Sequence, residues 1–526
     1  MKKERCLHNP LLPGCYPDPS VCRAGDDYYM IASTFEYFPG IPIFHSKDFV
    51  NWHQIGHALT RPEQLDTDGL NPSRGIYASS IFYHEGRKRF YIITTLVGNA
   101  PYWDNVNFYI WAERPEGPWS DPIVVERAEG IDPSLVFDGD QTYYLGNLRP
   151  DPDHVGKGRH IWLQELDLDS GRLMGERLIL REQGALTGAA APEGPHIYHI
   201  GDWYYLLIAE GGTSYRHACT VFRSRSITGP YEGNPRNPVM THRNLAKDYP
   251  IGCTGHADLI ELYNGEWWAV LLACRTELNN CRVLGRETFA VPVTWEDEWP
   301  VFSPDTGHVE FTYPAPKLSE HTWEVRPCCD NFENGKLADC WITARTPGRP
   351  FYDLDARLGY LRLFLQPETN TGVKACSFLG QRQRHFSYMA WTKIEFLPEQ
   401  DGAVCGLVLL LNNQYHIRFL YGMSGGEKTL TLIRRYEDRD FIISAQPWKQ
   451  PVTYLRITAR SGRLEFSFAE KPEEWTILAD QVDERLVGDA TGGIYTGTVI
   501  GLYASSGGQE SSNYADIDWF EYQGID

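Results

Sequence analysis

Three carboxylic acids occupy matching places in three segments that otherwise read alike. Asp18 lies in "YPDPS", Asp132 in "GIDPS" and Glu193 in "PEGPH"; each precedes an apolar run, a turn with Gly, and an aromatic pair. Taken singly, Asp18 or Asp132 would more often be a turn residue. Because clustered carboxylates repel each other, three acids in phase indicate a function. An acid that protonates a leaving oxygen and a second carboxylate that activates water together cleave a glycosidic bond.

The segments that hold these acids belong to a fivefold repeat. Matching segments begin at positions 18, 80, 132, 193 and 256, so the intervals are 62, 52, 61 and 63 residues. Each segment predicts a β-hairpin followed by further strands. Five such units without a convincing amphipathic helix predict an all-β fold, a five-bladed β-propeller. The residues expected to face its central cup are Asp18, Ser80, Asp132, Glu193 and His256.

The repeat stops near residue 310, and a different pattern follows. Residues 313–327 are punctuated by proline and predict a linker that wraps one surface. The short alternating runs beyond them predict a jelly-roll-like β-sandwich. We therefore expect a catalytic propeller over residues 1–312, a linker over residues 313–327, and a sandwich over residues 328–526 that contributes a loop to the active site.

Composition and charge exclude several classes of partner. The net charge is −20 and no stretch is basic, which argues against nucleic acid and anionic membrane surfaces. No apolar run approaches the ~20 residues of a membrane span. The amino-terminal stretch has a basic tip without an apolar region, so it does not resemble a secretory signal. With twelve scattered cysteines and no metal spacing, these features predict reduced thiols and a cytoplasmic protein.

Residues 8 to about 310 resemble glycoside hydrolase family 43, the β-xylosidase and α-L-arabinofuranosidase group. The resemblance is carried by "NPLLPGCYPDPSVCRAGDDYYMIASTFEYFPGIPIFHSKDFVNW", "GIDPSLVFD", "APEGPHIY", "AEGGTSY", "TGHADL" and "LGRETF". The family is a five-bladed propeller that inverts configuration. The resemblance implies that Asp18 is the general base, Asp132 the carboxylate that tunes and orients the acid, and Glu193 the general acid.

The resemblance also implies substrate-binding residues. Arg286 in "LGRET" resembles the substrate-binding arginine, and Phe35 in "STFEYFPG" resembles a wall of the sugar subsite. Tyr77 stands where many members carry Trp, and Ser79-Ser80 replaces the usual small-Pro-polar sequence. Both departures leave the choice between xylose and arabinose open.

His256 in "TGHADL" resembles an axial histidine that faces a calcium ion or waters in some members. The alternative is a buried histidine satisfied by backbone groups. A calcium ion in the propeller channel would be structural or electrostatic, and no cofactor is expected to be required for the reaction.

Longer family members carry a jelly-roll-like domain, and in some of them one of its loops closes the active site. The stretch "GGIYTGTVIGLYA" resembles that loop, with Tyr495 as its aromatic residue; the alternative is that Tyr495 packs inside the sandwich. A closed pocket admits only a chain end. We therefore expect an inverting exo-glycosidase that releases terminal β-D-xylosyl or α-L-arabinofuranosyl units from xylan-derived oligosaccharides.

Two other functions remain open on the sequence. An endo-arabinanase on the same propeller would need an open groove, and a non-catalytic carbohydrate-binding propeller would be expected to have lost one of the three acids. The expected partner is a xylo- or arabinoxylo-oligosaccharide. The resemblance also raises the expectation of dimers or tetramers.

Overall fold

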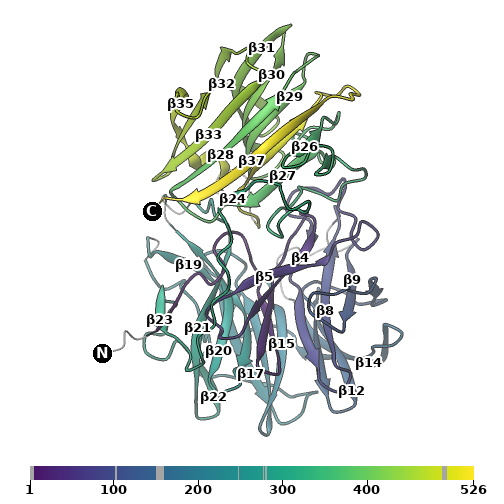
Figure 1. Ribbon diagram of the computed structural model, residues 1–526. Helices are drawn as coiled ribbons and strands as arrows, with labels where there is room; N and C mark the ends of the chain where they lie inside the picture. Colours follow the sequence, from purple (N-terminus) through teal and green to yellow (C-terminus); the bar gives the residue numbers. More distant parts are fainter. Residues whose placement is uncertain are drawn as a thin grey trace.

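The computed structural model describes residues 5–100, 104–149, 159–246, 248–276, 278, 281–488 and 495–525. Its elements are β-strands and one 3₁₀ helix, η1 (Glu484–Val487). Among the described residues, no helix combines the length and apolarity that crossing a bilayer requires. Figure 1 shows two bodies, one built from the purple and teal strands and one from the green and yellow strands.

The first body is a five-bladed β-propeller, which confirms the predicted fold. Each blade is an antiparallel sheet, and the inner strands β2, β7, β11, β15 and β19 contact one another in this order before β19 returns to β2. Blade 1 contains β2 (Ser20–Ala24), β3 (Asp27–Ile31), β4 (Gly40–Ser46) and β5 (His53–Leu59). Blade 2 contains β6 (Gly75–Ile76), β7 (Ser80–His84), β8 (Arg89–Val97), β9 (Val106–Ala112) and β10 (Ile123–Val124).

The remaining three blades have four strands each. Blade 3 contains β11 (Ser134–Asp138), β12 (Gln141–Leu148), β13 (His160–Asp167) and β14 (Arg172–Arg181). Blade 4 contains β15 (Glu193–Ile200), β16 (Trp203–Glu210), β17 (Ala218–Ser224) and β18 (Glu232–Gly233). Blade 5 contains β19 (Ile251–Glu261), β20 (Trp267–Arg275), β21 (Glu287–Glu296) and β22 (Trp299–Phe302).

Apolar side chains of neighbouring blades pack against each other. Ile31 of blade 1 shares a buried cluster with Ile92 of blade 2. Leu145 of blade 3 likewise shares one with Leu206 of blade 4. Because one small sheet cannot bury its own faces, the repeat is stable only as a closed ring.

Blade 2 corrects one prediction. Ser80 was expected to face the cup, but its hydroxyl donates to the backbone oxygen of Pro133 in blade 3 at 3.0 Å. Ser134 makes the matching bond to Pro195 in blade 4 at 2.6 Å, so Ser80 is in phase with Ser134. Ala78, two residues earlier, lines the pocket instead. The turn between β7 and β8 spans residues 85–88, longer than the two-residue turns of blades 1, 3 and 4, so counting ten residues back from the aromatic pair stops short of Ala78, at Ser80.

The segment after the last blade runs along the propeller. Strand β23 (Thr312–Pro314) pairs with β1 (Cys6–His8), so part of the predicted linker lies in a strand. Farther along, the backbone N–H of His321 donates to Asp48 at 2.9 Å. The indole of Trp323 donates to the backbone oxygen of Asn51 at 3.1 Å. These contacts fasten the segment to blade 1.

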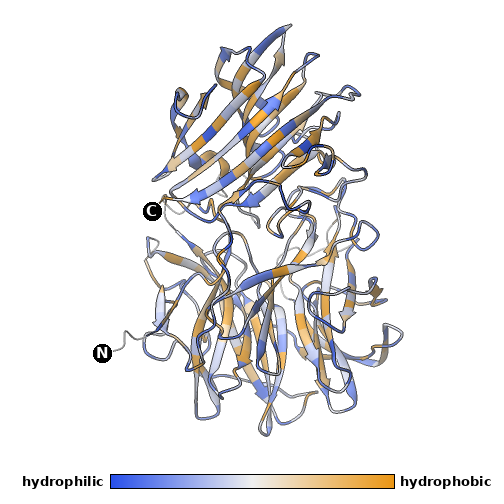
Figure 2. Ribbon diagram, viewed as in Figure 1, coloured by the Kyte–Doolittle hydropathy of each residue, from blue (hydrophilic) through white to orange (hydrophobic). Residues whose placement is uncertain are grey.

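The second body is a β-sandwich, also as predicted. One sheet has the order β25-β26-β37-β28-β33-β34-β35 with β24 beside β37, and the other has the order β27-β36-β29-β30-β31-β32. Along many of these strands hydrophobic and hydrophilic residues alternate, as Figure 2 shows, and the inward residues form one large buried cluster. The strands are β24 (Cys329–Asp330), β25 (Tyr352–Asp353), β26 (Leu361–Phe364), β27 (Ser377–Arg382), β28 (Tyr388–Phe396), β29 (Val404–Leu410), β30 (Tyr415–Ser424), β31 (Glu427–Tyr436), β32 (Arg439–Pro447), β33 (Val452–Arg460), β34 (Arg463–Ala469), β35 (Thr476–Asp483), β36 (Val499–Ser505) and β37 (Tyr514–Gly524).

The sandwich lies across one face of the propeller (Figure 1). Phe38 and Thr343 exchange two backbone hydrogen bonds of 3.1 and 2.7 Å across the junction. Gly285 and Gly497 approach so closely that a Cβ on Gly285 would lie 2.8 Å from the backbone nitrogen of Gly497. This approach brings the segment that follows residue 494 to the mouth of the propeller.

Glu484, at the start of η1, predicts a pH-dependent stability. It is fully buried, accepts one hydrogen bond from Gln383 at 2.7 Å, and burial raises its pKa to about 7. Between pH 4.5 and 7 the unfolded chain therefore releases a proton that the folded chain keeps, so Glu484 lowers stability as the pH rises. The wild type should therefore lose stability relative to Glu484→Gln as the pH rises. From pH 4.5 to pH 8, the difference in unfolding free energy should grow by about 3 kcal/mol in favour of the variant.

Urea unfolding at several pH values measures this difference. The exposed Glu473 supplies the control, because Glu473→Gln should leave the pH dependence of stability as it is. Parallel curves for Glu484→Gln and the wild type would contradict the prediction.

Candidate active site

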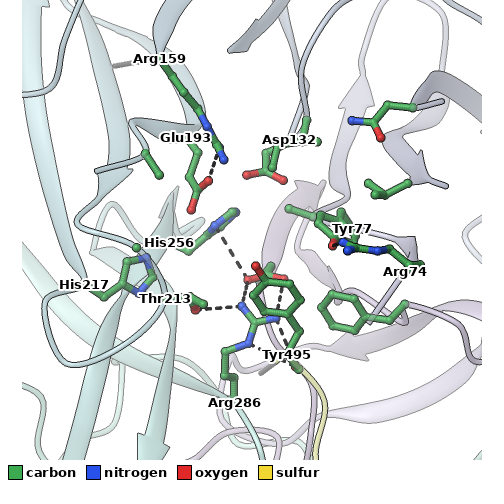
Figure 3. A pocket seen from close by; sticks show the side chains of 18 residues that line it. Arg74, Tyr77, Asp132, Arg159, Glu193, Thr213, His217, His256, Arg286 and Tyr495 are labelled. Carbon is green, nitrogen blue, oxygen red and sulfur yellow. Dashed lines mark hydrogen bonds and ion pairs between the residues drawn. The ribbon is translucent and has the colours of Figure 1, made fainter. Parts of the chain in front are cut away.

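A pocket of about 160 Å³ opens where the inner strands begin, beneath the sandwich. It receives side chains from all five blades and one from the sandwich (Figure 3). The predicted residues that line it are Asp18, Phe35, Tyr77, Asp132, Glu193, His256, Arg286 and Tyr495. The acids therefore meet in one cavity although they are far apart in the sequence.

A left-handed backbone turns these side chains toward the axis. Asp18, Asp132 and His256 have φ of 53°, 54° and 52°, a conformation that costs a non-glycine residue about 1–3 kcal/mol. In blade 4 the residue after the acid, Gly194, takes this conformation with φ of 54°. A Cβ on Gly194 would lie 2.8 Å from the ring of His256, so glycine is required there. The same strained backbone at equivalent places in several blades indicates a functional site.

Asp18 is surrounded by groups that stabilise its charged form. Arg286 donates to its carboxylate with Nη1 at 2.8 Å and Nη2 at 3.4 Å, and the Ser33 hydroxyl donates at 2.7 Å. Burial favours the protonated form, but Arg286, His256 and Ser33 together hold the pKa of Asp18 below its ordinary value. Asp18 is therefore a carboxylate at neutral pH and can accept a proton.

Asp132, Glu193 and Arg159 form the second polar cluster of the pocket. Arg159 donates a short hydrogen bond to the carboxylate of Glu193 (Figure 3). Burial and the charges of Glu193 and Asp18 raise the pKa of Asp132 well above its ordinary value, against the effect of Arg159. Burial and the neighbouring carboxylates therefore favour the protonated form of Asp132, and Arg159 contacts Glu193 from the other side.

Aromatic rings from both bodies wall the pocket. The rings of Phe35 and Tyr495 stack with centroids 5.9 Å apart. Tyr77 meets Phe35 edge-on at 5.4 Å and Tyr495 at 5.9 Å. Tyr495 thus lies in the pocket and not in the core of the sandwich. Residues 492–494 of the predicted loop lie outside the described residues.

Arg286 ties the sandwich segment to the acids. Besides Asp18, it donates to the backbone oxygen of Tyr495 through Nε and Nη2, each at 3.3 Å. Its Nη1 also donates to the Thr213 hydroxyl at 3.1 Å. One guanidinium therefore holds Asp18, the backbone of Tyr495 and a loop of blade 4 in one arrangement.

Two histidines lie on the blade 4 and 5 side of the pocket. Nδ1 of His256 is 3.9 Å from the carboxylate of Asp18. Burial lowers the pKa of His217 to about 3, so this ring is neutral. The described part of the chain contains no group of three or more His, Cys, Asp or Glu side chains that could hold a metal. The protein side chains near His256 therefore do not fit a calcium ion by themselves; such an ion stays a prediction and enters no step below.

Sequence reasoning missed several residues of the site. They are Arg74, Asn105, Arg159, Thr213 and His217. Arg159 precedes the third strand of its blade, whereas the repeat draws attention only to the inner strands. Arg74 donates to the Tyr77 hydroxyl at 3.1 Å from the loop before β6. Thr213 lies in "AEGGTSY", a stretch that already carried the family resemblance and was the one available signal.

Comparison with known proteins gives matches along both bodies. The sequence profile described as "Glycosyl hydrolases family 43" matches residues 7–300. A second profile, described as "Beta xylosidase C-terminal Concanavalin A-like domain", matches residues 329–523. Together they span the propeller and the sandwich in the same order as the structure.

Whole proteins of similar length match as well. The chain is 38% identical to a "non-reducing end alpha-L-arabinofuranosidase" of Bacteroides ovatus, over 99% of this chain and 96% of that protein. It is 39% identical to a "xylosidase/arabinosidase" of Butyrivibrio fibrisolvens, over 98% and 99%. The crystal structure of a xylan beta-1,4-xylosidase from Bacillus halodurans superposes with a TM-score of 0.91, 33% identity, and 98% and 100% coverage.

Proposed function

Because the chain belongs to glycosyl hydrolase family 43, we propose that it removes single pentosyl units from oligosaccharide ends with inversion of configuration. The relatives that match its full length are named as xylosidases and arabinofuranosidases. The chain is accordingly a glycoside hydrolase of the exo-acting xylosidase and arabinofuranosidase kind. The finer points, which are the sugar, the stereochemistry and the role of each residue, are part of the proposal.

One observation carries the proposal: three acids from three blades share a pocket that a second domain closes. The pocket, about 160 Å³, is smaller than the roughly 300–1,000 Å³ of drug-sized ligand sites. With Tyr495 across one side, it suits one sugar at a chain end and does not suit the open groove of an endo-arabinanase. All three acids are present, which disfavours a binding protein without catalysis.

Asp18 and Glu193 supply the proposed chemistry. Asp18 takes a proton from a water molecule as the water oxygen bonds to the anomeric carbon. The glycosidic bond breaks on the opposite side, and the departing oxygen takes its proton from Glu193. The sugar thus gains a hydroxyl of inverted configuration, and the two carboxyl groups exchange their protonation states.

Asp132 acts on the proposed acid through its position beside Glu193. Burial, together with the charges of Glu193 and Asp18, raises the pKa of Asp132 well above its ordinary value, and Arg159 donates to Glu193. A protonated Asp132 adds no negative charge beside Glu193 and has a proton to share with it, which supports a tuning role for Asp132.

Two measurements test the proposed function together. Rates on an aryl β-D-xyloside and an aryl α-L-arabinofuranoside, backed by xylobiose and arabinoxylo-oligosaccharides, show which pentose is preferred. Proton NMR of the first-formed sugar should show the inverted anomer. A retained anomer would exclude water activation by Asp18, and release of internal fragments from a polymer would favour an endo-acting enzyme.

The biological role, the cellular location and the oligomeric state of the enzyme are proposals as well. A role in the degradation of xylan rests on the names of the relatives, and digestion of xylan-derived oligosaccharides tests it. The cytoplasmic location and an oligomeric state come from the sequence and the resemblance only. Cell fractionation and light scattering test them.

A further inference from the structure

Blade 4 carries a second cavity that the mechanism above does not use. It is an open groove of about 330 Å³, lined by residues from the segments 187–190, 211–216 and 243–244. We call it the blade 4 groove. Tyr215 projects there with 54% of its surface exposed, beside the exposed side chains of Arg243 and Asn244.

The blade 4 groove and the catalytic pocket share their walls. In the loop 211–216, Thr213 lines the pocket and accepts from Arg286, whereas Tyr215, two residues later, lines the groove. In the segment 187–191, Ala191 lines the pocket and Ala190 lines the groove. A ligand longer than one sugar that leaves the pocket over these segments enters the groove.

The wall of the groove is held from beneath by a buried acid. Glu210, with 1% of its surface exposed, accepts from the backbone N–H of Ala185 at 2.8 Å and of Leu186 at 3.1 Å. The Thr220 hydroxyl donates to the same carboxylate at 2.6 Å. Gly211 N–H in turn donates to the Ala190 oxygen at 2.7 Å. A groove fixed in this way loses little entropy when a ligand binds.

The geometry of the displacement places the leaving part of the substrate on the side of blade 4. An inverting displacement needs water on one side of the sugar and the leaving group on the other. Asp18 comes from blade 1 and Glu193 from blade 4, which are not neighbours in the ring. The leaving oxygen lies at Glu193, so the rest of the substrate extends past it, over the blade that carries the groove.

We propose that the blade 4 groove binds the pentosyl units on the reducing side of the bond that is cleaved, with Tyr215 stacked on a sugar ring. The inference rests on the proposed function and extends it. An aromatic ring suits the apolar face of a sugar, and Arg243 and Asn244 provide donors for its hydroxyls. Arg216 Nε donates to the Tyr215 hydroxyl at 3.0 Å and steadies the ring.

The test is the dependence of kcat/KM on chain length. For the wild type, kcat/KM should rise from xylobiose to xylotriose and xylotetraose. Tyr215→Ala should lower the ratio of xylotriose to xylobiose activity by about three- to tenfold, because one ring contact is lost. Tyr215→Phe keeps the ring and should restore most of the ratio.

The controls separate the groove from the catalytic function. Tyr263, an exposed tyrosine in the β19–β20 turn, is at the other end of the propeller, and Tyr263→Ala should leave the ratio as in the wild type. A wild type with equal activity on all lengths, or a Tyr215→Ala variant that loses activity on every substrate equally, would overturn the groove alone. A wild type inactive on aryl pentosides would instead overturn the proposed function.

Discussion

Asp18→Gly is expected to lower kcat by roughly 10²–10⁴-fold, the contribution of a general base. Glycine is the suitable replacement because residue 18 has a φ of 53°, which glycine adopts without strain. The substitution also leaves a space beside Arg286 where the water-activating carboxylate stood. Steady-state kinetics on xylobiose measures the loss, and thermal unfolding checks that the variant folds.

Azide shows whether the lost group was a base. The azide anion needs no deprotonation, so it should enter the space in Asp18→Gly and restore turnover of an aryl pentoside. The product would be a glycosyl azide whose anomeric configuration is opposite to that of the substrate. Asp27→Asn, at the other end of the hairpin of blade 1, should retain wild-type kcat. Failure of azide to restore turnover, or a product of retained configuration, would contradict the role of Asp18.

The second large effect is expected for Glu193→Ala, and it depends on the leaving group. Hydrolysis of xylobiose should fall roughly 10²–10⁴-fold, because the sugar oxygen cannot leave without a proton. A dinitrophenyl pentoside releases an anion that is already stable, so its hydrolysis should fall by less than about tenfold.

The contrast between the two substrates is the decisive measurement. Glu182, an exposed residue shortly before the same blade, provides the control, and Glu182→Ala should leave both rates unchanged. Equal losses on xylobiose and on the dinitrophenyl pentoside would show that Glu193 acts in some way other than proton donation.

The sequence repeat predicted the propeller because every blade must bury its apolar faces in the same way. A small sheet with apolar faces needs neighbours, so the same apolar, turn and aromatic pattern returns about every 60 residues. The acids fell in phase with it because Asp18 and Asp132 precede short two-residue turns. Ser80 failed because the turn of its blade is longer, and turn length is not part of the pattern that defines the repeat.

Other parts of the site depend on contacts that no local pattern contains. Arg159 reaches Glu193 from the start of β13, and Arg74 comes from the loop before β6. Only the closed ring of blades brings Arg159 beside Glu193 and Arg74 into the same pocket. The sequence therefore predicted which carboxyl groups meet, whereas the ion pair between Arg159 and Glu193 depends on tertiary structure.

The junction at Gly285 and Gly497 has a consequence for folding during synthesis. A polypeptide emerges from the ribosome amino end first, and its domains fold in that order. All five blades precede Tyr495, and β37, which lies between β26 and β28 in its sheet, is made later still. The pocket of a nascent propeller therefore lacks the side that Tyr495 closes until the strands of the sandwich have been synthesised. We therefore expect a chain interrupted before Tyr495 to hydrolyse its substrate more slowly than a chain that contains the sandwich.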